Sequence, residues 1–83
     1  MNAVTTNSRR ISPIMVEAIV DHAETVAREN NYPAHIIEAY VSGVSSRGTL
    51  DDNMGYNPHY EGSFIWEFYE AGYHLRNMPE YRA

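Results

Sequence analysis

The chain of 83 residues has no cysteine, no lysine and no long apolar run. Without cysteine there is no disulfide, thiol nucleophile, Cys-ligated zinc or iron–sulfur cluster, and a reducing compartment is favoured. No apolar stretch approaches the roughly 20 residues needed to span a bilayer. The first ten residues lack the apolar core of a secretory signal. We therefore expect a cytoplasmic protein with no membrane association.

Positive charge is scarce as well. Six arginines stand against eleven acidic residues, and the formal net charge is −5 at pH 7. Two of these arginines, Arg9 and Arg10, lie in the polar N-terminal segment. Nucleic-acid-binding proteins usually present a basic face that neutralises phosphates. The sequence provides no such face, so we expect no direct nucleic-acid binding. An acidic surface serves either solubility alone or attraction to a basic protein surface.

The length predicts a single domain with a thin core. The expected organisation is a flexible tail at residues 1–10 followed by a single helical domain at residues 11–83. Catalysis needs a pocket that excludes water, and so short a chain leaves little room for one. The sequence also has no nucleophile elbow and no glycine-rich phosphate loop. We therefore expect that this protein is not an enzyme.

Apolar periodicity predicts a first helix from about Pro13 to Asn30. Ser12 suits the N-cap, and Pro13 suits the first helical position because its missing N–H is no loss there. Asn30 and Asn31 predict its end. The apolar residues that recur on one side at helical spacing are Met15, Val16, Ile19, Val20, Ala23, Val26 and Ala27.

A second helix is predicted to open at Pro33, with Gly48 as a left-handed stop. Its apolar side is formed by Ile36, Ile37, Tyr40, Val41 and Val44. From Gly48 to Asn57 the chain is rich in Gly, Asp and Asn without a period, which predicts a loop.

A third helix is predicted to begin near Ser63 and to end at Met78-Pro79. Its main apolar side comprises Phe64, Ile65, Phe68, Ala71, Gly72 and Leu75, and its aromatic flank comprises Trp66, Tyr69 and Tyr73. Together the three segments predict an all-α domain, in which one helix is followed by a helix–loop–helix hairpin.

Four histidines invite a metal hypothesis, but the positions of His22, His35, His59 and His74 match no ligand spacing on a helix face. The acidic segment that starts at Asp51 fits a calcium loop poorly, because Gly55 and Gly62 fall where oxygen ligands are required. We expect neither a metal site nor a cofactor.

The aromatic content points to binding. Seven tyrosines and one tryptophan are many for this length, and five of the tyrosines lie between Tyr56 and Tyr81. These side chains anchor protein interfaces because they bury much area at little entropic cost. A thin core cannot accommodate all of them. The predicted partner-binding patch consists of Tyr56, Tyr60, Glu61, Glu67, Tyr69, Glu70 and Tyr73.

Residues 39–73 carry a pattern of aromatic residues and glycines. The pattern comprises Tyr40 with Gly43, then Asn57-Pro58-His59-Tyr60, then Tyr69-x-x-Gly72-Tyr73. It resembles the ribosome modulation factor family of small helix–loop–helix proteins. The resemblance implies a helix–loop–helix fold and a role on the ribosome. In that family the role involves basic residues that contact ribosomal RNA, whereas this chain is acidic.

Three functions follow as expectations. The first is a small acidic regulator or inhibitor that binds a basic surface of a host protein or nucleoprotein complex, in the manner of many phage or mobile-element accessory proteins. The alternative is a ribosome-associated hibernation or modulation factor. A further alternative is a structural homodimer that pairs its own apolar surface.

Overall fold

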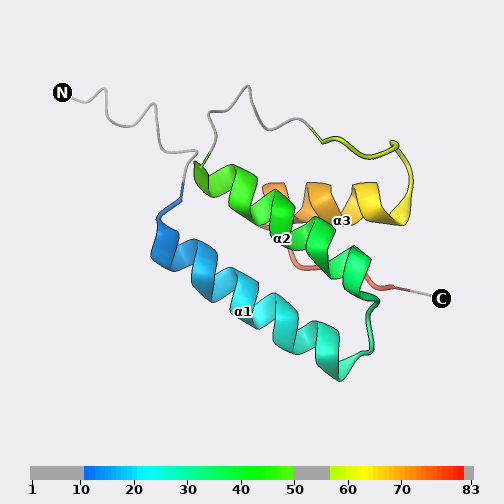
Figure 1. The fold of residues 1–83 in the computed structure, drawn as a ribbon, viewed down its shortest axis with the longest axis horizontal. Coiled ribbons are helices and arrows are strands. Elements are labelled where there is room, and N and C mark those ends of the chain that lie inside the picture. Colours follow the sequence, from blue (N-terminus) through cyan, green and yellow to red (C-terminus); the bar gives the residue numbers. More distant parts are fainter. Residues whose placement is uncertain (1–10, 50–56, 82–83) are drawn as a thin grey trace.

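The computed structural model describes residues 11–49 and 57–81. Within these ranges it contains three helices and no strand, in the order α1 (Pro13–Glu29), α2 (Ala34–Thr49) and α3 (Phe64–Tyr73) (Figure 1). The expected all-α domain of three helices is confirmed. The predicted tail at residues 1–10, Asp51 and Tyr56 lie outside the described residues. In the described part of the chain, no helix has the length and apolar character to cross a membrane.

Both ends of α1 follow from local sequence. The Ser12 side chain accepts a hydrogen bond from the Met15 N–H at 3.2 Å, which satisfies one free donor of the first turn. At the other end Asn31 has a φ of 57°, and the Tyr32 N–H bonds the Ala27 carbonyl at 3.0 Å. This is a Schellman arrangement with asparagine in the left-handed position. The predicted boundaries of α1 are confirmed to within one residue.

The predicted stop at Gly48 is wrong. The second helix begins just after Pro33 and continues through Gly48 to Thr49. A tertiary contact holds its last turn, because the Arg47 guanidinium donates to the Tyr73 carbonyl of α3 at 2.7 Å. The helix thus continues through a glycine, although glycine costs about 1 kcal/mol relative to alanine in a helix.

The third helix starts at Phe64, close to the predicted start near Ser63, and its N-cap is Ser63. The predicted end at Met78 is wrong, because α3 stops at Tyr73. Leu75 takes a left-handed φ of 58°, and the Arg76 N–H bonds the Ala71 carbonyl at 2.8 Å to close a second Schellman arrangement. The chain beyond turns back toward the start of α3.

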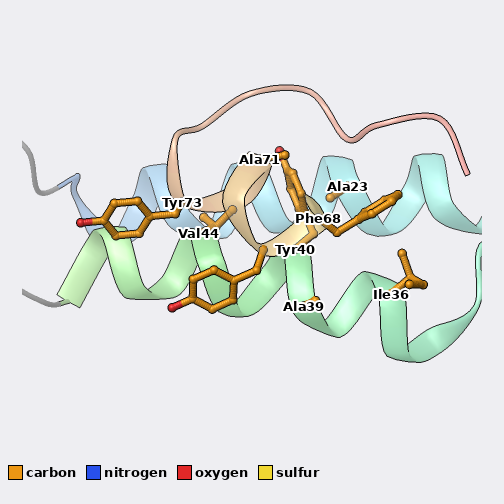
Figure 2. Close-up of a cluster of buried hydrophobic side chains, with 9 residues drawn as sticks. Ala23, Ile36, Ala39, Tyr40, Val44, Phe68, Ala71 and Tyr73 are labelled. Atoms are coloured by element: carbon orange, nitrogen blue, oxygen red, sulfur yellow. The ribbon is translucent and has the colours of Figure 1, made fainter. Parts of the chain in front are cut away.

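The core lies where α2 crosses α3 (Figure 2). A Cβ atom on Gly43 would overlap the Tyr69 carbonyl oxygen, and a Cβ atom on Gly72 would overlap the Tyr40 carbonyl oxygen. The two helix backbones therefore touch through a reciprocal pair of glycines. The buried side chains around this contact are Ala23, Ile36, Ala39, Tyr40, Val44, Phe68, Tyr69, Ala71 and Tyr73.

Two further segments complete the core. Helix α1 lies alongside α2 (Figure 1) and contributes Ala23 to the buried cluster. The Tyr32 ring, between α1 and α2, meets the Phe68 ring edge-on with centroids 5.8 Å apart. Its hydroxyl donates to the Pro79 carbonyl at 3.2 Å. This hydrogen bond ties the segment after α3 to the junction between α1 and α2.

Candidate partner-binding surface

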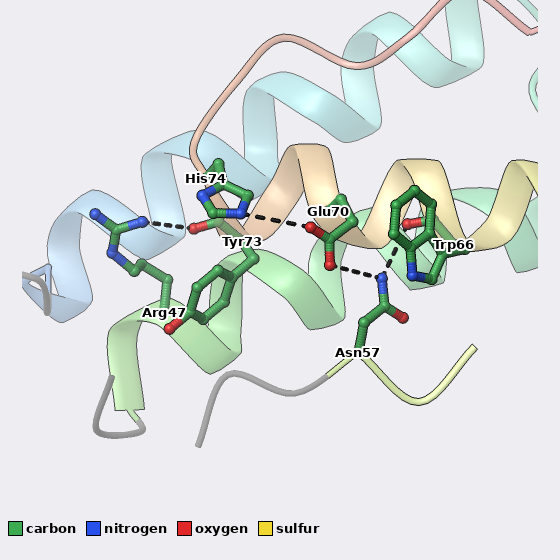
Figure 3. A network of polar contacts seen from close by, with 6 residues as sticks. All are labelled: Arg47, Asn57, Trp66, Glu70, Tyr73 and His74. Carbon is green, nitrogen blue, oxygen red and sulfur yellow. Dashed lines mark hydrogen bonds and ion pairs between the residues drawn. The ribbon is translucent and has the colours of Figure 1, made fainter. Parts of the chain in front are cut away.

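The segment before α3 is fixed by Asn57 (Figure 3). Its side-chain amide donates to the Trp66 carbonyl and to a Glu70 carboxylate oxygen, each at 3.0 Å. Its side-chain oxygen accepts from the His59 N–H, also at 3.0 Å, which closes a local turn. The Asn57 side chain thus holds the segment that precedes α3 against the side of that helix.

Ser63 then orients Tyr60. The Ser63 hydroxyl donates to the Tyr60 carbonyl at 2.7 Å and accepts from the Trp66 N–H at 3.1 Å. Between them Gly62 has a φ of 93°, a conformation that glycine adopts without strain. The Tyr60 main chain is therefore anchored on the helix cap. Its side chain is turned outward and is 86% exposed.

Three residues of the predicted patch are exposed. Tyr60, Glu61 and Glu67 are all exposed at the N-terminal end of α3. Glu70 is half-buried, because its carboxylate is held by Asn57 and lies 3.5 Å from the His74 ring (Figure 3).

Tyr69 and Tyr73 were expected at the surface, and that expectation is wrong for both. The Tyr69 hydroxyl shares a hydrogen bond with the Ser46 hydroxyl at 2.8 Å. The Tyr73 ring lies 5.5 Å from the Arg47 guanidinium carbon, close enough for a cation–π contact. Their burial follows from the contact at Gly43, which lets α3 approach α2 so closely that the aromatic flank is enclosed.

Sequence reasoning missed Phe64 as a surface residue. It was assigned to the apolar core side, yet its side chain is 43% exposed and its ring centroid lies 5.2 Å from that of Tyr81. Phe64 stands about two turns before the crossing at Gly72, where α2 and α3 are in closest contact. Its position directly after the Ser63 cap was the available signal.

We name Tyr60, Glu61, Phe64 and Glu67 the acidic-aromatic patch. Glu67 lies in the first turn of α3, where the positive end of the helix dipole favours a carboxylate. A hollow of about 360 Å³ adjoins the patch, and it is lined by Trp66, Glu67, Glu70, Ala71, Arg76, Asn77 and Pro79. Exposed rings beside carboxylates form a surface suited to contact with a cationic protein face.

The polar groups elsewhere in the described residues are occupied structurally or exposed. No three His, Asp or Glu side chains in those ranges are arranged to hold a metal ion. His59 packs edge-on against the Tyr69 ring, with centroids 5.7 Å apart. Each buried side-chain nitrogen or oxygen of the described part has a hydrogen-bond partner. The acidic-aromatic patch is therefore the candidate partner-binding surface.

Comparison with protein-family models, curated proteins and solved structures gives no match for this chain. The class that the structure defines is a small all-α domain with an exposed acidic-aromatic patch at the start of α3.

Proposed function

We propose that this chain is a small non-enzymatic regulator or inhibitor that acts in the cytoplasm. Its acidic-aromatic patch docks onto a basic surface of a host protein or nucleoprotein complex. The observation that carries the proposal is the outward projection of Tyr60 from an anchored turn, together with the exposure of Glu61, Phe64 and Glu67 near the start of α3. No direct contact with nucleic acid is required.

The anchoring of the turn favours binding energetically. Tyr60 is presented by a main chain that is hydrogen-bonded to Ser63, so little backbone freedom is lost when a partner covers the ring. Glu61 and Glu67 attract cationic groups and raise the rate of encounter, an effect that salt screens. The tyrosine would provide the buried anchor, and the carboxylates would select the partner.

Affinity purification from a cell extract tests this proposal. The paired variant Glu61→Lys/Glu67→Lys reverses both charges of the patch, and Tyr60→Ala removes the anchor. We expect each to reduce recovery of a defined protein partner by about tenfold or more. Raising the salt from about 0.1 M to about 0.5 M should also weaken capture by the native chain.

The matched control is Glu17→Lys/Asp21→Lys, which makes the same charge change on exposed positions of α1. It should leave the captured protein unchanged, and circular dichroism should show that all variants remain helical. Equal recovery by the patch variants and the native chain would refute the proposed surface.

The second candidate is a ribosome-associated modulation-type factor. It is favoured by the pattern shared with that family, since Gly43 and Gly72 are the residues through which α2 and α3 touch. Sucrose-gradient sedimentation of stationary-phase extracts separates the two candidates. Sedimentation with ribosomal particles supports the second candidate, whereas recovery in the soluble protein fractions removes it.

A further inference from the structure

The hollow that adjoins the acidic-aromatic patch is formed by two parts of the chain. Helix α3 lines it with Trp66, Glu67 and Glu70, and the segment after α3 lines it with Arg76 and Pro79. Glu67 and Glu70 are three residues apart and Trp66 and Glu70 are four apart, so these side chains are neighbours on the helix surface. Glu67 belongs to both the hollow and the patch, which makes the two surfaces continuous.

Tertiary contacts fix both walls of this hollow. On α3, the Glu70 carboxylate accepts from the Asn57 amide at 3.0 Å and lies 3.5 Å from the His74 ring nitrogen Nε2 (Figure 3). In the segment after α3, the Pro79 carbonyl accepts from the Tyr32 hydroxyl at 3.2 Å. A recess whose walls are already held loses less conformational freedom when a side chain enters it.

The charges of the lining favour a cation. Among the described residues that line the hollow are two carboxylates and one guanidinium, and Arg76 forms no ion pair with Glu67 or Glu70. Glu67 is exposed, and no described residue holds its carboxylate. Glu70 retains acceptor capacity, because a carboxylate offers about four lone-pair sites and Asn57 uses one.

We propose that this hollow receives an arginine side chain of the basic protein surface to which the patch binds, an inference that rests on the proposed function. A guanidinium can stack on an indole and donate to a carboxylate at the same time, and Trp66 and Glu67 supply these two groups. A lysine ammonium is a compact, strongly hydrated charge without a planar face. The hollow therefore selects arginine over lysine.

Arg76 makes the sign of the ligand's charge testable. Its guanidinium opposes a second cation in the same hollow, so removal of its charge should strengthen the binding of an arginine. An anionic ligand would instead use Arg76 as its donor, and removal of the charge would then weaken binding. The variant Arg76→Gln thus separates the two kinds of ligand by the direction of its effect.

NMR titration of the full chain at low salt tests the proposal. The probe is a short peptide that carries two arginines between glycines, added from about 0.1 mM to about 20 mM, and the comparison is the same peptide with lysines. Trp66 is the single tryptophan of the chain, so its indole N–H signal reports on the hollow. We expect a saturable shift of this signal, with the arginine peptide binding about threefold or more tighter than the lysine peptide.

Two variants of the hollow have matched controls on α1. Glu67→Gln should weaken binding of the arginine peptide by about threefold or more, and Arg76→Gln should strengthen it by about twofold or more. Glu17→Gln and Arg28→Gln make the same charge changes at exposed positions of α1 and should bind the peptide nearly as the native chain does. Circular dichroism should show equal helicity for all four.

The proposal is overturned if the indole signal does not shift, if the two peptides bind equally well, or if Glu17→Gln weakens binding as much as Glu67→Gln. Weaker binding by Arg76→Gln would also overturn it. The titration uses the purified chain and is independent of partner capture. Absence of arginine binding, together with recovery of a basic protein that is lost in Tyr60→Ala, would remove the hollow and leave the proposed function standing. Arginine binding without any recovered protein would count against the proposed function alone.

Discussion

At the scale of single residues, two glycines allow α2 and α3 to touch. Gly43 faces the carbonyl of Tyr69, which lies three residues before Gly72. In the same way, Gly72 faces the carbonyl of Tyr40, which lies three residues before Gly43. This reciprocity gives the Tyr-x-x-Gly repeat a packing role. The carbonyl oxygens belong to backbone, which cannot move aside as a flexible side chain can.

We expect Gly43→Ala to destabilise the domain by about 3 kcal/mol or more, because the added methyl group forces the helix backbones apart. Urea unfolding followed by circular dichroism measures this loss. Gly62→Ala is the contrasting variant. Its Cβ meets no atom within 4 Å, and the cost of its φ of 93° should be about 1 kcal/mol. An unchanged urea midpoint for Gly43→Ala would contradict a direct contact between the backbones of α2 and α3 at Gly43.

Tyr40 joins the core to the segment after α3. Its hydroxyl donates to the Arg76 carbonyl, and burial of the phenol raises the pKa of Tyr40 above its ordinary value of 10.0. Burial favours the neutral phenol, so between the two pKa values the folded state binds more protons than the unfolded state. The stabilisation is complete below the unfolded pKa and is lost as the pH rises toward the folded pKa.

The free energy of unfolding should therefore fall as the pH increases from about 9 to about 11. Tyr40→Phe should lower stability by about 1 kcal/mol at neutral pH, because it leaves the Arg76 carbonyl without its donor. The same variant should make the alkaline decline shallower, since the titrating group is gone. Urea titrations at several pH values measure both effects, and an equally steep decline in the variant would contradict this role for Tyr40.

At the scale of helices, local signals predicted the fold well. Ser12 and Asn31 mark the ends of α1 because capping and the left-handed conformation depend on short-range chemistry. Ser63 marks the start of α3 for the same reason. The sequence therefore predicts three helices and most of their boundaries.

Features that depend on packing between helices were not predictable in this way. Leu75 takes the left-handed position that ends α3, although nothing in its own chemistry favours that conformation. Its side chain is partly buried against the core, which identifies the compensating contact. Likewise Tyr69 and Tyr73 appeared as an outer flank because periodicity does not reveal that Gly43 brings α2 over them.

The uneven burial of the helices predicts uneven stability. Helix α3 contributes five buried residues, whereas α1 contributes Ala23 and Ala27. Local opening costs least where few apolar contacts are broken. Native-state hydrogen exchange at low protein concentration should show α1 amides exchanging at a lower free energy than those around Gly43 and Gly72. Equal protection of all three helices would contradict a core centred on α2 and α3.

At the scale of the whole molecule, the acidic-aromatic patch uses residues at the start of α3, whereas an apolar groove of about 470 Å³ lies between α1 and the segment that follows α3. The patch shares no residue with the lining of that groove.

Site-specific photocrosslinking in living cells addresses the patch directly. A photoreactive phenylalanine analogue in place of Tyr60 reports what lies against that side chain, and the same analogue at Glu17 on α1 is the control. We predict a covalent adduct with a defined protein at position 60 that is absent at position 17 and survives nuclease treatment. Adducts with nucleic acid alone, or the same adducts from both positions, would contradict the proposal that the acidic-aromatic patch binds a basic protein surface.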